Sequence, residues 1–273
     1  MNITEINISE KYKIEGNATL TCYVNENEGE LARYNKSLPA IIVAPGGGYA
    51  FVSRREAEPI AIEFLSRHYN VFVLNYDVAP YRYPVPLMQR ACSVDYVKRN
   101  ARKLGVNAKQ VFAIGFSAGG HLVGLLSNLY DNLPQKEING KPLDAKLSGV
   151  ILSYPVIYPN SHLGSFKNLL GLTDEEATGK KAQKFALQKM VTPNTTPTFI
   201  WATREDDCVT VDATIEYSKA LSANGVVFES HIFPYGWHGL STCDARTNDK
   251  KDVSNFQKAQ VWLDLANEFL QTL

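Results

Sequence analysis

Hydrophobic residues along the chain gather in short continuous runs, and amphipathic segments separate these runs. The run at residues 38–45, LPAIIVAP, is apolar throughout and bounded by prolines, which is typical of a strand buried on both faces. The segment at residues 86–105 instead repeats apolar residues at helical spacing and stops at a glycine, which predicts a helix. Further buried strands are predicted at residues 70–80, 110–117, 147–157, 196–203 and 227–234.

Helical segments lie between most of these strands. Strands that alternate with helices predict a mostly parallel, doubly wound sheet with helices on both faces, which is an α/β fold. Two earlier strands are predicted at residues 6–14 and 18–24. The other predicted helices are at residues 55–69, 118–130, 212–225 and 253–271.

The domain organisation follows from what interrupts this alternation. We find no internal repeat and no linker that marks a second domain, so we expect one domain over residues 1–273. The longest irregular region runs from about residue 154 to 196, with a short helix predicted at about 175–190. We expect this region to form a small cap-like insertion over the carboxyl edge of the sheet.

Composition and charge narrow the function classes. The chain is 45% hydrophobic and 21% charged with zero net charge, as in ordinary globular proteins, so nothing favours a nucleic acid or a membrane as partner. No apolar run approaches a membrane span, and the first residues lack the pattern of a signal peptide, so we expect a cytoplasmic protein. The four cysteines lack metal-ligand spacing and favour free thiols, with one disulfide as the alternative.

A candidate nucleophile stands where a buried strand changes into a helix. Ser117 lies in GFSAG, with Gly115 two residues before it and Gly119 two residues after it. A sharp strand-to-helix turn exposes such a serine and crowds those two positions, which must then lack side chains. The alternative is a tight turn with an inactive serine, and the position between strand and helix argues against it.

A serine needs a base, and the base needs an orienting acid. In this topology the expected chain order is serine, acid, histidine. Asp206 and Asp207 directly follow the predicted strand at 196–203, and His238 follows the one at 227–234 in a glycine-flanked loop. All three strand ends lie at the same edge of the sheet, so the sequence predicts a triad with either aspartate as the acid.

The remaining candidates concern the oxyanion and the other histidines. Gly46, Gly47 and Gly48 follow a buried strand and leave backbone N–H groups uncovered, and the amide of Ala118 begins the next helix. These amides favour an oxyanion hole over a phosphate loop, because the glycine run lacks the lysine and spacing of phosphate-binding motifs. His121 is interpreted as a packed helix residue. His162, in the insertion, is the other histidine that could touch a substrate.

The motifs PGGGY, NYDVAPYRYPVP, GFSAGGHL, REDDCV and YGWHG resemble the α/β-hydrolase superfamily, specifically the small esterase and lipase group with acetylesterases and acetyl-xylan-esterase-like carbohydrate esterases. The resemblance covers nearly the whole chain. It implies the α/β-hydrolase fold and a serine hydrolase that cleaves short acyl esters, such as acetylated carbohydrates, without a cofactor or metal.

Carried over to this sequence, the resemblance makes Ser117 the nucleophile, His238 the base and Asp206 the acid, because the family's aspartate lies three residues before a valine, here Val209. Gly47, Gly48 and Ala118 become the oxyanion donors.

Two positions depart from the family pattern. Pro45 stands where many lipase relatives have a histidine, which leaves the donor pair open, and Thr210 stands where a proline commonly follows the valine.

The substrate pocket and the alternatives complete the predictions. Tyr49 and Trp237 adjoin the glycine loop and His238, so we expect them to wall the acyl pocket, with ordinary packing as the alternative. The expected partner is a small ester, and a homo-oligomer is compatible with the sequence. The competing functions are a non-catalytic ligand-binding protein on the same fold, and an amidase or peptidase with the same triad.

Overall fold

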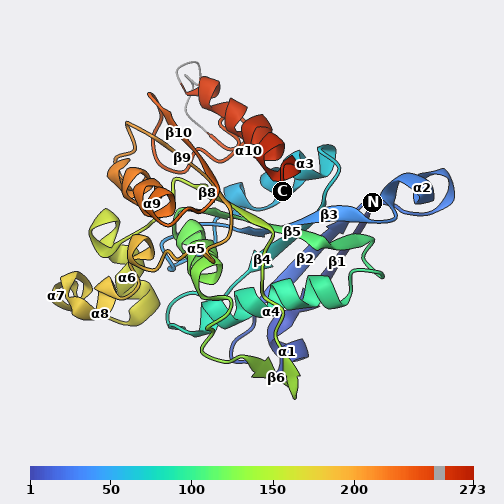
Figure 1. Ribbon diagram of the computed structural model, residues 1–273, viewed down its shortest axis with the longest axis horizontal. Coiled ribbons are helices and arrows are strands. Elements are labelled where there is room, and N and C mark those ends of the chain that lie inside the picture. Colours follow the sequence, from blue (N-terminus) through green and yellow to red (C-terminus); the bar gives the residue numbers. More distant parts are fainter. Residues whose placement is uncertain (249–255) are drawn as a thin grey trace.

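The computed structural model describes residues 1–248 and 256–273 (Figure 1). Its centre is an eight-stranded sheet with the strand order β1-β2-β4-β3-β5-β8-β9-β10. The strands are β1 (Asn2–Asn7), β2 (Thr19–Val24), β3 (Leu38–Ala44), β4 (Asn70–Asn75), β5 (Val106–Phe116), β8 (Gly149–Ser153), β9 (Thr198–Thr203) and β10 (Phe228–Phe233). β2 pairs antiparallel with both of its neighbours, β1 and β4. From β4 to β10 in this order, all neighbouring strands pair in parallel. The predicted doubly wound, mostly parallel sheet is confirmed.

Helices of very different lengths surround this sheet. The α-helices are α1 (Ile8–Tyr12), α2 (Ala32–Asn35), α3 (Glu58–Ser66), α4 (Val85–Arg99), α5 (Ala118–Leu129), α6 (Leu163–Leu170), α7 (Asp174–Thr178), α8 (Lys180–Gln183), α9 (Asp212–Ala223) and α10 (Trp262–Gln271). The short 3₁₀ helices are η1 (Gly29–Leu31), η2 (Arg54–Glu56), η3 (Pro159–Ser161), η4 (Leu187–Lys189) and η5 (Gln257–Val261), and β6 (Glu137–Ile138) pairs with β7 (Lys141–Pro142). None of these helices, within the described part of the chain, is long and apolar enough to cross a bilayer.

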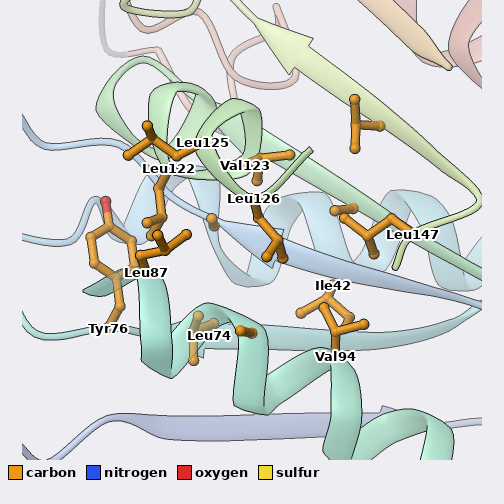
Figure 2. Close-up of a cluster of buried hydrophobic side chains, with 14 of the residues drawn as sticks. Ile42, Leu74, Tyr76, Leu87, Val94, Leu122, Val123, Leu125, Leu126 and Leu147 are labelled. Carbon is orange, nitrogen blue, oxygen red and sulfur yellow. The ribbon is translucent and has the colours of Figure 1, made fainter. Parts of the chain in front are cut away.

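The core has two halves, one on each face of the sheet. Side chains along a strand point alternately to the two faces, so Ile42 of β3 joins one buried cluster and Ile41 and Val43 join the other. Helices α4, α5 and α9 contribute to the first cluster, part of which is shown in Figure 2, and α3 and α10 contribute to the second. Figure 1 shows α4 and α10 on opposite sides of the sheet.

Two predicted elements differ from the structure. The predicted strand at residues 6–14 is wrong beyond residue 7, because the side chain of Asn7 accepts a hydrogen bond from the Glu10 amide and begins α1. The predicted helix at 175–190 is divided into α7, α8 and η4, because Gly179 adopts an extended conformation between α7 and α8. Part of the predicted helix at 253–271 lies outside the described residues, and its remainder forms η5 and α10.

Candidate active site

Ser117 occupies a strained turn between β5 and α5. Its backbone has φ 53° and ψ −119°, a conformation that non-glycine residues rarely adopt. A Cβ atom at Gly115 would lie 2.3 Å from the carbonyl oxygen of Gly119, and one at Gly119 would lie 2.1 Å from that of Ala44. Both positions therefore require glycine, and the turn presents the serine at the carboxyl end of β5.

A continuous series of hydrogen bonds joins Ser117 to His238 and Asp206. Nε2 of His238 lies 2.8 Å from Oγ of Ser117, and Nδ1 lies 2.7 Å from Oδ2 of Asp206. The carboxylate can only accept, so Nδ1 donates its proton to Asp206 and Nε2 is free to accept the serine proton. The Asp206 side chain is fully buried, which shields this interaction from water.

The loop after β9 distinguishes the two neighbouring aspartates. Oδ1 of Asp206 accepts hydrogen bonds from the backbone amides of Cys208, at 2.9 Å, and Val209, at 2.8 Å, which turns Oδ2 toward His238. Asp207 is exposed. The structure therefore places Asp206 beside the histidine, as the resemblance implied and the residues alone left open.

The glycine loop after β3 lies beside Ser117. Gly47 and Gly48 have φ values of 125° and 63°, which favour glycine. The Gly46 amide donates to Oε2 of Glu56 at 2.7 Å, so it is not available to a ligand. The amides of Gly47, Gly48 and Ala118 have no acceptor among the described residues, and Ala118 is the first residue of α5. These three amides can donate to a developing oxyanion.

A cavity of about 600 Å³ opens in front of Ser117. Its walls come from the glycine loop, from η2, from the loops that carry Asp206 and His238, and from the insertion after β8. The insertion contributes His162 and Asn168, so it does lie over the carboxyl edge of the sheet. Among the described residues there is no cluster of three or more side chains that could hold a metal ion.

Tyr49 and Trp237 do not line this cavity. The prediction that Tyr49 walls the acyl pocket is wrong, because its side chain is buried beneath the loop, with the hydroxyl 3.0 Å from Nδ1 of His121. Trp237 packs edge-on against Phe256, with ring centroids 4.3 Å apart, and lines a neighbouring hollow. For Tyr49, packing was the correct alternative.

His121 is a buried packing residue, as interpreted from the sequence. Its Nε2 donates to the carbonyl oxygen of Phe185 at 2.9 Å, so Nδ1 accepts from the hydroxyl of Tyr49. Burial lowers the pKa of His121 to about 4, so the ring is neutral at neutral pH. The histidine thereby connects α5 to the insertion.

A buried carboxyl group that the sequence did not predict lies beside the site. Glu56 accepts from the Gly46 amide through Oε2, and its Oε1 accepts from the hydroxyl of Tyr154 at 2.8 Å. The Tyr154 hydroxyl in turn accepts from the amide of Ser241 at 2.9 Å, and the Tyr154 ring lies 5.1 Å from that of His238. Burial raises the pKa of Glu56. No motif in the sequence marks this glutamate, since its role depends on tertiary contacts.

Asn168, Phe51 and Cys208 were also missed as lining residues. Asn168 donates from Nδ2 to the carbonyl oxygen of Gly48 at 2.9 Å, which fastens α6 to the glycine loop. The irregular appearance of the insertion in the sequence concealed this helix.

Two curated proteins are similar to most of this chain. A region of 214 residues is 36% identical to endo-1,4-beta-xylanase B of Butyrivibrio fibrisolvens and covers 75% of this chain and 33% of the relative. A region of 234 residues is 28% identical to an acetylxylan esterase of Xylanibacter ruminicola and covers 83% of this chain and 44% of the relative. The chain thus spans less than half the length of these curated relatives.

One solved structure is similar to almost the whole of this chain. The acetyl ester-xyloside bifunctional hydrolase of Caldicellulosiruptor lactoaceticus is 31% identical, with a TM-score of 0.80, over 95% of this chain and 89% of that one. Residues 31–221 also match the model of the BD-FAE family. The sheet, the serine turn and these matches together show that the chain belongs to the BD-FAE family and has the α/β-hydrolase fold.

Proposed function

We propose that this protein is a serine carboxylesterase that hydrolyses short-chain acyl esters, with acetylated sugars as the substrate class. The observation that carries the proposal is the hydrogen-bonded series from Ser117 through His238 to the buried Asp206. The relatives named for acetylxylan esterase and acetyl ester hydrolysis support the choice of substrate.

The chemistry proceeds in two halves. In the first, Oγ of Ser117 attacks the ester carbonyl carbon while Nε2 of His238 takes the hydroxyl proton, and Asp206 stabilises the imidazolium. The amides of Gly47, Gly48 or Ala118 donate to the tetrahedral oxyanion. When the carbon–oxygen bond to the alcohol breaks, the imidazolium returns its proton to the leaving oxygen, and the acyl group remains on the serine.

In the second half, water replaces the alcohol. His238 takes a proton from the water as it attacks the acyl carbonyl, and the serine leaves with that proton from the imidazolium. The products are a carboxylic acid and the regenerated enzyme. The same residues could cleave an amide, but no feature of the cavity favours that bond. A complete triad argues against a protein that only binds ligands.

Replacing the nucleophile tests the proposal. Ser117→Ala removes the atom that forms the acyl-enzyme, so we expect kcat for p-nitrophenyl acetate to fall by at least about a thousandfold. Circular dichroism should show an unchanged fold. The matched control is Ser66→Ala, an exposed serine at the end of α3 whose hydroxyl donates to the carbonyl oxygen of Glu63 in the same helix. Activity of Ser117→Ala within tenfold of wild type would refute the assignment.

A further inference from the structure

His162 is fixed in one orientation by the helix that follows it. It is the N-cap residue of α6, and its Nδ1 accepts a hydrogen bond from the backbone amide of Ser165 at 3.1 Å, with the Ser165 hydroxyl 2.8 Å away. A backbone amide can only donate, so Nδ1 carries no proton. The neutral ring therefore has its proton on Nε2. Burial lowers the pKa of His162, and the nearby His238 lowers it further, which keeps the ring neutral.

The ring faces the cavity in front of Ser117. His162 lines that cavity, and its Cε1 lies 3.7 Å from the position a Cβ atom of Gly48 would take. Among the described residues, Nε2 has no acceptor. Nε2 is accessible to solvent, and His162 lines the cavity. Nε2 is thus an oriented donor beside the glycine loop.

The chemistry of the substrate limits what can accept this hydrogen bond. A short acyl group has one oxygen, the carbonyl oxygen, and the amides of Gly47, Gly48 and Ala118 are available to that atom. Any further acceptor in the cavity must therefore belong to the alcohol half of the ester. A simple alkyl alcohol contributes only the ester oxygen, to which His238 returns its proton, whereas a polyhydroxy alcohol also has a hydroxyl oxygen next to the esterified carbon.

We propose that His162 binds the alcohol half of the substrate by donating from Nε2 to a hydroxyl oxygen adjacent to the ester, and so selects esters of polyhydroxy alcohols. The inference rests on the proposed esterase function. It assigns alcohol specificity to the insertion, whereas the chemical step belongs to residues at the sheet edge. Asn168 supports the arrangement, because its bond to Gly48 holds α6 against the glycine loop.

The test compares two acetate esters with His162→Asn. Asparagine is a good N-cap residue, so its side-chain oxygen can still accept from the Ser165 amide while the donor that reaches the cavity is lost. The substrates are cyclohexyl acetate and the monoacetate of trans-cyclohexanediol, which differ by one neighbouring hydroxyl. The measured quantity is the ratio of kcat/KM for the hydroxylated ester to that for the plain ester.

We expect wild type to prefer the hydroxylated ester and His162→Asn to reduce that ratio by about 3- to 10-fold, which is the value of one neutral hydrogen bond. Turnover of cyclohexyl acetate should fall less than turnover of the hydroxylated ester, and the melting temperature should change little. A ratio unaffected by the substitution overturns the inference. An equal loss for both esters also overturns it, since that result indicates an oxyanion donor or a structural role. If wild type cleaves neither ester nor p-nitrophenyl acetate, the proposed function itself is wrong.

Discussion

The two oxygens of Asp206 have separate roles. Oδ1 is held by the amides of Cys208 and Val209, and Oδ2 accepts from His238. In Asp206→Asn the amide oxygen should stay with the two backbone donors, so the NH₂ group faces Nδ1 of His238. Nδ1 then has to accept, and Nε2 carries the proton.

A histidine in that tautomer cannot take the proton of Ser117. We therefore expect Asp206→Asn to lower kcat for p-nitrophenyl acetate by about four orders of magnitude, as tautomer loss does in other triads. The control is Asp207→Asn, whose exposed side chain should leave the rate within about threefold of wild type. A larger loss in Asp207→Asn than in Asp206→Asn would reverse the assignment.

The sequence predicts the role of a residue best where the contacts that fix the residue come from its neighbours in the chain. Gly115 is required by a contact with Gly119 inside the same turn, so the spacing of this pair is visible in the sequence, whereas Gly119 is also crowded by the carbonyl of Ala44 on β3. The sequence does not show in which direction the Tyr49 side chain points. Gly48 and Tyr49 are consecutive left-handed residues, with φ values of 63° and 55°, and this backbone course directs the tyrosine into the core. An aromatic residue in that loop could equally have faced the cavity.

Among the elements, η2 connects the glycine loop to the loop that carries His238. The two oxygens of Glu56 accept from the Gly46 amide and the Tyr154 hydroxyl, and Tyr154 accepts from the Ser241 amide. All of these groups are buried, so each depends on its partner in the protein. The carboxylate fits this position because both of its oxygens accept.

Glu56→Gln should disturb this connection at nearly constant volume. A glutamine places an NH₂ group against either the Gly46 amide or the Tyr154 hydroxyl, and one donor then loses its acceptor. We expect a loss of about 1–3 kcal/mol in the free energy of unfolding in urea. We also expect at least a tenfold lower kcat, because the glycine loop and the His238 loop shift relative to Ser117.

Glu58→Gln is the matched control, since Glu58 is exposed in the first turn of α3 and should leave both quantities nearly unchanged. Stability and kcat of Glu56→Gln equal to those of the control would show that the buried carboxylate does not position the loops.

Element boundaries were predictable where apolar periodicity is strong. Buried strands such as β3 and β9 lie within the predicted ranges because their central residues form continuous apolar runs. The division at residue 7 depends instead on one capping hydrogen bond, and the division between α7 and α8 falls at a single glycine, Gly179. Those interactions are too small to alter a hydropathy pattern.

For the whole molecule, the alternation of strands and helices predicted the class of fold but not the order of the strands. Periodicity states which residues are buried, and it does not state which strand a buried strand pairs with. The sequence therefore did not predict that β3 lies between β4 and β5. This position is what places the glycine loop next to Ser117.

His121 links pH to the stability of the whole fold. The pKa of this buried histidine is about 4 in the folded protein, against 6.5 as its ordinary value. Below pH 6.5 the unfolded chain therefore binds a proton that the folded protein does not, so stability falls as pH falls from 6.5 toward 4. We expect this group alone to lower the free energy of unfolding by about 2 kcal/mol between pH 7 and pH 5.

Urea unfolding of wild type and His121→Gln at these two pH values measures the effect. Glutamine can donate to Phe185 and accept from Tyr49 without titrating, so the variant should lose about 2 kcal/mol less than wild type on acidification. Equal losses in both proteins would mean that His121 does not stay neutral in the folded state.

Under the proposed esterase function, we expect the insertion to limit the length of the acyl group that the cavity accepts. A long chain needs an apolar trough, because each buried methylene contributes about 0.8 kcal/mol. The apolar residues of the insertion do not supply one: Phe166, Leu169 and Leu187 are buried in the core cluster, and Phe185 and Met190 pack against that cluster. The insertion contributes two polar side chains to the cavity, His162 and Asn168.

The cavity itself is also poor in large apolar walls. Of the residues that line it, Phe51 is the one large hydrophobic side chain in the described part of the chain, and the others are mainly glycine, polar or charged. We therefore expect kcat/KM for p-nitrophenyl esters to be highest from acetyl to butyryl and to decline beyond about six carbons, where added methylenes find no dry surface. The series should be measured below micelle-forming concentrations. A maximum at octanoyl or longer would indicate a lipase, and would require an apolar surface that the insertion does not provide in this structure.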